Sequence, residues 1–192
     1  MDKIRDSADI LQPEKEETYQ FIEKLLSSVK ENFSTNRVHL GMDEAVMLGL
    51  GNYLKENGYK KGSLIIREHC NRVVDICRKL ELKPMIWSDM YITANSTGGY
   101  YDLPENTDCS KWEKPKKDLG LVYWDYYHDD TRTYEKMLDI HAQLSDNVIF
   151  AGGSWIWNGI SPNYSKTYAC TKAALSTCKK YNIKEVLCTA WL

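Results

Sequence analysis

The sequence has no excess of charge of either sign: 25 lysines and arginines stand against 27 aspartates and glutamates, which gives a formal net charge of -2. Such a balance provides no overall field that would attract nucleic acid or an anionic membrane, so neither is expected as a partner. No apolar run approaches the roughly 20 residues of a membrane span, and the N-terminal residues lack the apolar stretch of a signal peptide. We therefore expect a cytoplasmic protein with no membrane partner.

Motifs for metals, phosphates and disulfides are also missing. The six cysteines include no CxxC pair, and the four histidines form no HExxH motif. Free thiols in a reducing compartment are favoured over disulfides, and a zinc site is not expected. The run Gly49-Leu50-Gly51 lies inside a helical pattern and lacks a third glycine, which disfavours phosphate binding. The sequence therefore predicts no cofactor.

The sequence does contain an alternation of apolar strands and amphipathic helices. Apolar runs predict strands at 38–41, 83–87, 121–124, 148–151 and 185–191. Helical periodicity predicts helices at 13–33, after Glu44 through Leu54, and at 62–80, 132–144 and 164–181. The polar segment 89–117 is long enough to be a functional lid.

Strands separated by helical crossovers pair in parallel and carry their helices outside the sheet. A closed barrel of this kind normally takes about 250 residues, more than the 192 present. We therefore predict an α/β fold: a partial TIM (β/α)8 barrel with about five parallel strands and outer helices.

Acidic and aromatic side chains follow the predicted strands, at the edge where parallel α/β folds bind ligands. They are Asp43 and Glu44, then Trp87 and Asp89, then Tyr123 and Asp125, then Trp155 and Trp157, and finally Trp191. Taken singly, the acidic pair could cap a helix and the tryptophans could be core residues. Carboxylates among flat aromatic faces, repeated at successive strand ends, instead favour a sugar site. His39, within an apolar strand, fits a core histidine or a support for a functional residue.

The run His39-Leu40-Gly41-Met42-Asp43-Glu44 resembles the His-x-Gly-x-Asp-Glu signature of the glycoside hydrolase family 20 β-N-acetylhexosaminidases. Met42 replaces a second glycine common in the family, a change that resembles its bacterial branch. The resemblance extends from about Pro13 to Trp191 and aligns the five strands with strands 4 to 8 of the family's barrel. Residues 1–192 are thus expected to be the C-terminal part of the catalytic barrel, with no second domain.

The resemblance implies hydrolysis of terminal, non-reducing N-acetylhexosamine from glycans by a retaining, substrate-assisted mechanism. Glu44 would be the general acid and base, while Asp43 would orient the acetamido N–H and Tyr123 would bind the acetamido carbonyl oxygen. Trp87 and Trp191 would enclose the acetamido methyl group, and Asp125 would bind a sugar hydroxyl. The pattern of strand ends adds Asp89, Trp155 and Trp157 as further candidate sugar-binding residues.

Two alternatives stay open. The family's first three strands carry an arginine that grips the sugar and a histidine that supports the acid, so the chain could be an incompetent fragment that at most binds sugar. It could also be another two-carboxylate retaining glycosidase, which would prefer substrates without the acetamido group. In either case an open half-barrel exposes strand edges near 37–41 and 185–191, so we expect a homodimer through one of them.

Overall fold

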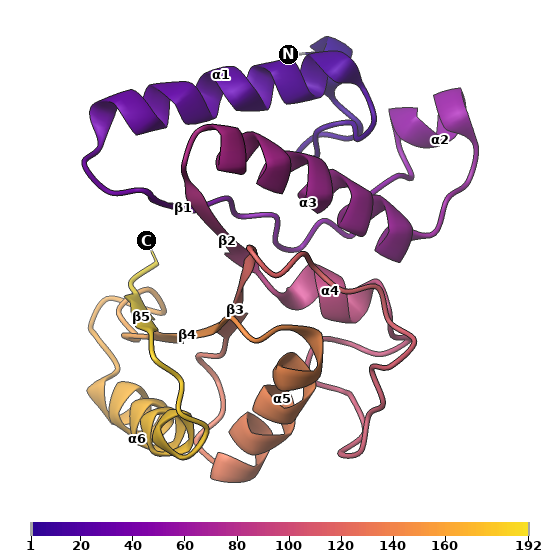
Figure 1. Ribbon diagram of the computed structural model, residues 1–192. Helices are drawn as coiled ribbons and strands as arrows, with labels where there is room; N and C mark the ends of the chain where they lie inside the picture. The colour runs from indigo at the N-terminus through magenta and orange to yellow at the C-terminus, as the bar shows by residue number, and fades with distance from the viewer. Residues whose placement is uncertain (1, 192) are drawn as a thin grey trace. The chain divides into compact units, whose positions relative to one another are not determined.

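The computed structural model describes residues 2–191, which divide into two compact units. Unit 1 comprises the residues up to 97 together with 112–119, and unit 2 comprises 98–111 together with the residues from 120 onward. Both units contain parallel strands connected through helices, as the ribbon shows (Figure 1).

Unit 1 contains two parallel strands and the helices that precede and follow them. Its elements are a short 3-10 helix (Asp2–Ile4), α1 (Glu16–Asn32), β1 (Arg37–His39), α2 (Asn52–Asn57), α3 (Gly62–Lys79), β2 (Lys83–Trp87) and α4 (Asp89–Thr93). Acidic residues Glu16 and Glu17 occupy the first turn of α1, where they complement the positive end of the helix dipole. Strand β1 pairs in parallel with β2, with Val38 opposite Pro84.

The core of unit 1 lies between α1 and α3, which run side by side (Figure 1). Residues Tyr19, Ile22 and Leu26 of α1 recur at helical spacing and are buried. They pack with Val73, Ile76 and Cys77 of α3 and with Leu82. Apolar residues of the β1 segment, among them Leu40 and Met42, pack against this cluster and so fix the face that β1 turns toward the helices.

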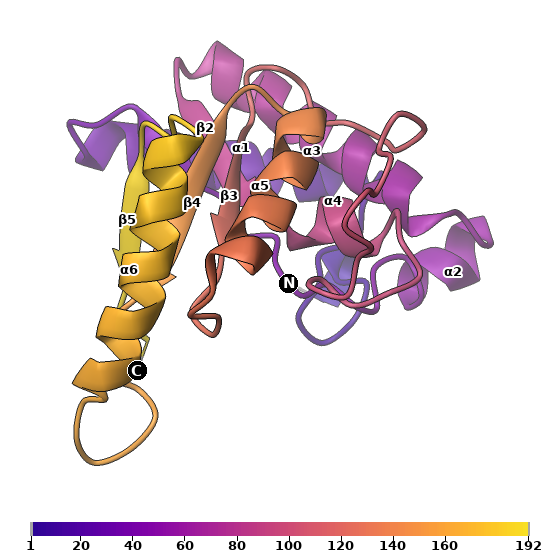
Figure 2. The ribbon, with the colours of Figure 1, turned by 90° about the horizontal axis from the view of Figure 1, so that it is seen from below.

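Unit 2 contains the other three strands and two helices. Its elements are β3 (Gly120–Trp124), α5 (Thr131–Leu144), β4 (Val148–Gly153), α6 (Tyr164–Lys180) and β5 (Val186–Thr189). Strand β4 pairs in parallel with β3 on one side and with β5 on the other. Asp130 and Asn163 cap α5 and α6, since their side chains accept the backbone N–H of Thr133 and Lys166. Helix α5 packs on β3, α6 packs on β4, and the two helices contact each other (Figure 2).

The observed elements confirm the predicted fold class, an α/β partial barrel with five parallel strands. The predicted helix through Leu54 is wrong in its first part: residues 45–51 form turns, and α2 begins only at Asn52. The predicted polar segment 89–117 begins with the short helix α4. The first and last strands are shorter than predicted, at Arg37–His39 and Val186–Thr189.

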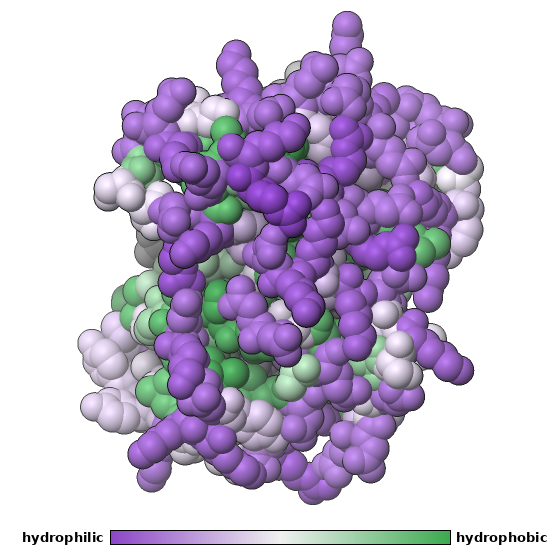
Figure 3. Space-filling model, in the orientation of Figure 1, coloured by the Kyte–Doolittle hydropathy of each residue, from purple (hydrophilic) through white to green (hydrophobic). Residues whose placement is uncertain are grey.

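The face of the chain drawn in Figure 3 carries more hydrophilic side chains on one unit than on the other. On this face, hydrophilic side chains cover most of unit 1, and apolar side chains are more frequent on unit 2. Among the described residues, no helix combines the length and apolar character needed to cross a membrane. Residues 2–191 hold no group of three His, Cys, Asp or Glu side chains placed to share a metal ion. All six cysteines are free thiols, and five of them are buried.

Candidate active site

The acidic pair lies on a tight turn, residues 41–44, that directly follows β1; we call it the acidic turn. Its backbone enters the left-handed region three times, with φ of +70° at Gly41, +70° at Met42 and +49° at Glu44. Residues other than glycine adopt this region at a cost of roughly 1 to 2 kcal/mol each, so surrounding contacts must hold the turn. The β1–β2 ladder extends into it, because Trp87 N–H donates to the Gly41 carbonyl over 3.1 Å.

His39 supports the start of the acidic turn. Its Nδ1 accepts the backbone N–H of Gly41 over 3.1 Å, and its ring lies 4.4 Å from the Trp87 ring, centroid to centroid. Because Nδ1 accepts, Nε2 carries the proton of the neutral ring. Burial lowers the pKa of His39, and the nearby Asp43 carboxylate partly opposes that shift. The neutral form is therefore favoured, as the bond to Gly41 requires.

Asp89 supports the other end of the acidic turn. This side chain is only 3% exposed, and its Oδ2 accepts the backbone N–H of Glu44 over 2.8 Å. The bond joins the first residue of α4 to the acidic pair across 45 positions of the chain. The geometry thus places Asp89 behind the turn, as a support for its backbone.

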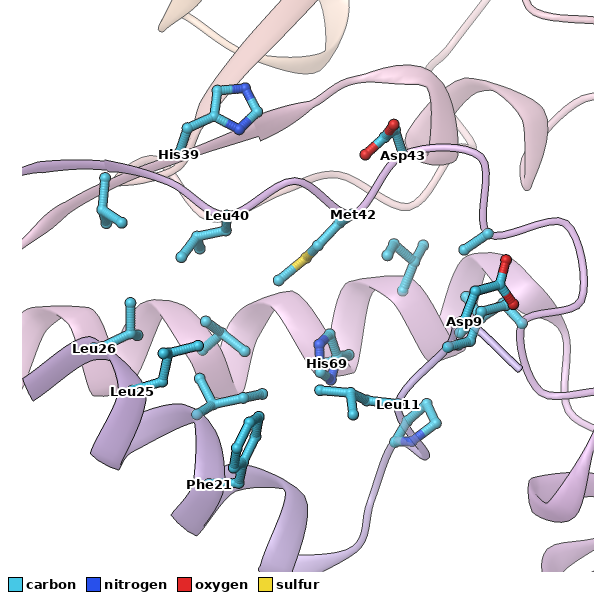
Figure 4. Close-up of a pocket in the computed structure, with 18 of the residues that line it drawn as sticks. Asp9, Leu11, Phe21, Leu25, Leu26, His39, Leu40, Met42, Asp43 and His69 are labelled. Atoms are coloured by element: carbon cyan, nitrogen blue, oxygen red, sulfur yellow. The ribbon is translucent and has the colours of Figure 1, made fainter. Parts of the chain in front are cut away.

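The side chains of the acidic pair are exposed. Along β1 and the acidic turn the side chains alternate: His39 and Asp43 project to one side, whereas Leu40 and Met42 project to the other (Figure 4). This arrangement places Leu40 and Met42 against the core of unit 1.

A cavity of about 490 Å³ lies on the core side of β1. It is open between α1, α3 and the β1 segment, and Figure 4 shows Phe21, Leu25 and Met42 around it together with His69. Its walls are mostly apolar, and the side chains of Leu40 and Met42 enter it from β1. This cavity is a gap in the packing of unit 1, and His39 and Asp43 are among the residues that line it (Figure 4).

A second polar cluster follows β3 in unit 2 and is centred on Asp125, whose side chain is fully buried. Its Oδ1 accepts the backbone N–H groups of Tyr127 and His128, over 2.9 and 3.2 Å. Its Oδ2 accepts the hydroxyl of Tyr123 over 3.0 Å and lies 2.8 Å from Nδ1 of His128. Both oxygens of the carboxylate are therefore occupied by groups of the chain itself.

Tyr123 is also fully buried, because it faces inward from β3 among aromatic rings of unit 2. Burial raises the pKa of Tyr123 well above its usual value, and the neighbouring Asp125 carboxylate raises it further. The hydroxyl thus stays protonated and donates to Asp125. The sequence analysis did not select His128; the signal available was its spacing of three residues from an acid at a strand end.

The aromatic residues after β4 form a cluster around Tyr126. Trp155 and Trp157 stack with their ring centroids 5.1 Å apart, and the indole N–H of Trp155 donates to the Tyr126 carbonyl over 2.5 Å. Tyr126 also contacts Trp157 and Trp191 edge to face, at 5.7 and 6.2 Å between centroids. Trp155 is buried, whereas Trp157 is half-buried and Trp191 is exposed, so the last two retain faces that a ligand could reach.

Within unit 1 the structure brings together His39, Trp87 and Asp89 around the acidic turn. Within unit 2 it brings together Tyr123 and Asp125, and separately the three tryptophans around Tyr126. The catalytic and sugar-binding roles of these residues stay predictions.

Three solved structures are similar to the chain at low sequence identity. The β-N-acetylhexosaminidase of Streptomyces coelicolor A3(2) is 12% identical with a TM-score of 0.47, and that of Streptomyces plicatus is 11% identical with a TM-score of 0.45; each match covers 79% of this chain and 25% of the other. The pneumococcal virulence factor StrH is 15% identical with a TM-score of 0.43, over 94% of this chain and 40% of the other.

This chain therefore spans a quarter to two fifths of the length of those proteins. The curated proteins contain no match to it. The family model for the catalytic domain of glycosyl hydrolase family 20 matches residues 2–144, a stretch that contains the acidic turn, Trp87, Asp89 and the Asp125 cluster. On that match, which covers well over half of the sequence, the chain belongs to glycosyl hydrolase family 20.

Proposed function

We propose that the chain carries the catalytic acid of an enzyme that hydrolyses terminal, non-reducing N-acetylhexosamine with substrate assistance. The observation that carries the proposal is the acidic turn: two exposed neighbouring carboxylates on a strained backbone that His39 and Asp89 hold from either end. Strain maintained by specific hydrogen bonds is typical of functional sites. The family match across the same residues supports a glycosidase.

In the proposed reaction, Glu44 protonates the glycosidic oxygen as the bond from that oxygen to the anomeric carbon breaks. The substrate's acetamido oxygen forms a bond to the anomeric carbon and gives an oxazolinium ion, so the protein supplies no nucleophile. Glu44 then removes a proton from the water that opens this ion. Asp43, ionised, accepts the acetamido N–H and stabilises the positive charge that develops there, an interaction strongest in the transition state.

Tyr123 is proposed to donate its hydroxyl to the acetamido oxygen. Its hydroxyl has one proton, which Asp125 accepts in the structure, so binding of substrate would exchange that partner. The burial of Tyr123 keeps the proton on the hydroxyl, which the proposed donation needs. Trp87, Trp157 and Trp191 are proposed to supply apolar surfaces to the sugar and its acetamido methyl group.

The chromogenic substrates p-nitrophenyl N-acetylglucosaminide and N-acetylgalactosaminide test the proposal directly. We expect cleavage of at least one, and a loss of about 100-fold or more in kcat for Glu44→Gln, because general acid–base catalysis contributes about 10² to 10⁴. The matched control is Glu31→Gln, the same change at an exposed position near the end of α1, which should leave the rate unchanged. Undiminished activity of Glu44→Gln would overturn the assignment.

Two further measurements separate the alternatives. An incompetent sugar-binding fragment would bind an N-acetylglucosamine-thiazoline inhibitor without cleaving either chromogenic substrate. A two-carboxylate glycosidase would cleave p-nitrophenyl glucoside faster than the acetamido substrate. Substrate assistance requires the reverse order, since the acetamido oxygen is the nucleophile.

A further inference from the structure

We propose that His128 is a sugar-binding residue of this site and that its Nε2 accepts a hydrogen bond from one hydroxyl of the pyranose ring. The inference rests on the proposed function and deepens it, because it names a polar contact that the family signature does not contain. It starts from the Asp125 cluster, in which Asp125 and Tyr123 are fully buried while the His128 side chain is 32% exposed. Of these three groups, His128 is the most exposed.

The hydrogen bonds of Asp125 fix the tautomer of His128. The carboxylate accepts two backbone N–H groups and the Tyr123 hydroxyl, so it acts as an acceptor toward every other partner. Nδ1 of His128, 2.8 Å from Oδ2, is therefore the donor in the remaining contact. A neutral imidazole that donates through Nδ1 presents a lone pair at Nε2. In that neutral form the side chain can accept a hydrogen bond at Nε2.

The surroundings of His128 hold the ring in this orientation. The ring of Tyr101 meets it edge to face at 4.9 Å between centroids, and the Tyr134 hydroxyl donates to the His128 carbonyl over 2.7 Å. Tyr101 is itself fixed, because its hydroxyl donates to the Trp124 carbonyl over 2.8 Å and its carbonyl accepts from Lys136 over 2.7 Å. Asp125 and Tyr101 thus hold the side chain and Tyr134 holds its backbone, so the ring loses little further freedom when it binds a ligand.

The chemistry of an exposed, fixed acceptor suits a hydroxyl donor. The sequence analysis gave the task of binding a sugar hydroxyl to Asp125, but all the hydrogen bonds around that buried carboxylate come from the chain. Asp125 instead orients His128, as a carboxylate orients the imidazole in other hydrogen-bonded pairs of this kind. The sugar hydroxyl is therefore bound by Nε2 of His128 and not by the Asp125 carboxylate.

Two variants separate ligand binding from support of the fold. In His128→Asn the side-chain amide can still donate to Asp125, but the acceptor at Nε2 is gone. In His128→Phe both are gone. Tyr127→Phe is the matched control, since it removes a polar atom from an exposed neighbour in the same loop. Because the binding measurements are made in a Glu44→Gln background, they do not depend on turnover.

The measurement is titration calorimetry with N-acetylglucosamine and N-acetylgalactosamine, followed by the 3-, 4- and 6-deoxy analogues of the tighter ligand. We expect one analogue to bind about 5- to 10-fold more weakly than its parent, the effect of one net hydrogen bond. His128→Asn should bind the parent sugar as weakly as the protein with His128 binds that analogue. It should no longer distinguish the parent from that one analogue, whereas Tyr127→Phe should still distinguish them. A merely structural role of His128 would weaken all ligands together.

Full discrimination in His128→Asn would overturn the inference, and so would a protein that binds none of these sugars. If the chromogenic substrates are cleaved but the preference for the parent sugar over its deoxy analogue does not depend on His128, the inference fails and the proposed function stands. If neither substrate is cleaved but that preference does depend on His128, the proposed hydrolysis fails and the sugar contact stands.

Discussion

Met42 occupies a backbone conformation that a glycine would adopt at lower cost. Its φ of +70° costs an L-residue roughly 1 to 2 kcal/mol, but its side chain enters the cavity beside α1 and lies with Sδ 3.6 Å from the Cys70 Sγ. Burial of a methionine side chain contributes about 1.5 to 3 kcal/mol. Packing therefore offsets the strain, which explains how a bulky residue is accommodated where the family commonly has glycine.

Asp89 gives a prediction at the same scale. Replacement by alanine leaves the Glu44 N–H without this acceptor, and a hydrogen bond to a charged group contributes about 1.5 to 3 kcal/mol. We expect Asp89→Ala to lower the free energy of unfolding by that amount and to speed amide hydrogen exchange at Glu44. Asp89→Asn keeps an acceptor oxygen and should retain most of the protection. Urea denaturation and exchange followed by NMR measure the two effects.

The control for this prediction is Asp130→Ala, which removes a comparable bond at the start of α5, where the side chain accepts Thr133 N–H over 2.8 Å. It should lower stability without a selective effect on the Glu44 amide. Equal exchange at Glu44 in Asp89→Ala and the unchanged protein would show that Asp89 does not hold the acidic turn.

At the level of the element, the sequence predicted the strands and helices whose apolar residues follow a regular pattern. Helices α3, α5 and α6 and strands β2, β3 and β4 lie within a few residues of their predicted bounds, since the helices carry apolar residues at helical spacing and the strands are continuous apolar runs. The predicted strand ends also directed attention to the acidic turn and to the Asp125 cluster, whose roles stay predictions.

The segment 45–51 could not be predicted because a residue far along the chain decides its shape. Asp6 is buried and accepts the backbone N–H groups of Gly49 and Tyr53, over 2.8 and 2.7 Å. Gly51 approaches the Asp6 carbonyl so closely that a Cβ would lie 2.0 Å from its oxygen. These tertiary contacts end the helical pattern that local spacing suggested. The roles of Asp89 and His128 escaped prediction for the same reason, because each depends on a hydrogen-bond partner that only the fold reveals.

Helix α5 gives a prediction about pH. His141 is fully buried on this helix, and burial lowers its pKa to about 4, although the Met137 carbonyl favours the protonated form. In the unfolded chain a histidine takes up a proton near pH 6.5, so the unfolded state binds more protons between pH 6.5 and 4. The stabilising contribution is therefore complete above pH 6.5 and is lost as the pH falls toward 4.

We expect the free energy of unfolding to fall by on the order of 2 kcal/mol from pH 7 to pH 5 because of His141. His141→Gln, which does not titrate, should show a correspondingly smaller decrease. Gln143→Ala, an exposed change on the same helix, should shift the curve without altering its slope. Parallel curves for His141→Gln and the unchanged protein, measured by urea denaturation across this pH range, would contradict the assignment.

At the scale of the whole molecule, the open edges of the sheet decide how the chain behaves in solution. Within unit 1, β1 pairs with β2 on one side, and within unit 2, β5 pairs with β4 on one side. A strand at the edge of a sheet can pair with a strand of another chain. Beside β1 lies the apolar cavity with the exposed residues Phe21 and Leu25, and Val186 on β5 is exposed as well.

A second copy of the chain is the partner we expect at the β1 edge, because the apolar wall beside β1 loses contact with water when a strand of another copy pairs there. Sedimentation velocity at micromolar concentration should then show a dimer. Leu25→Lys places a charge on the wall at a residue that is 53% exposed, and it should give monomers. Leu175→Lys is the same change on α6, at a residue that is 43% exposed, and it should leave the dimer intact. If the unchanged chain is a monomer, the predicted dimer does not form. If both variants dissociate the dimer to the same extent, the interface does not lie specifically at the β1 edge.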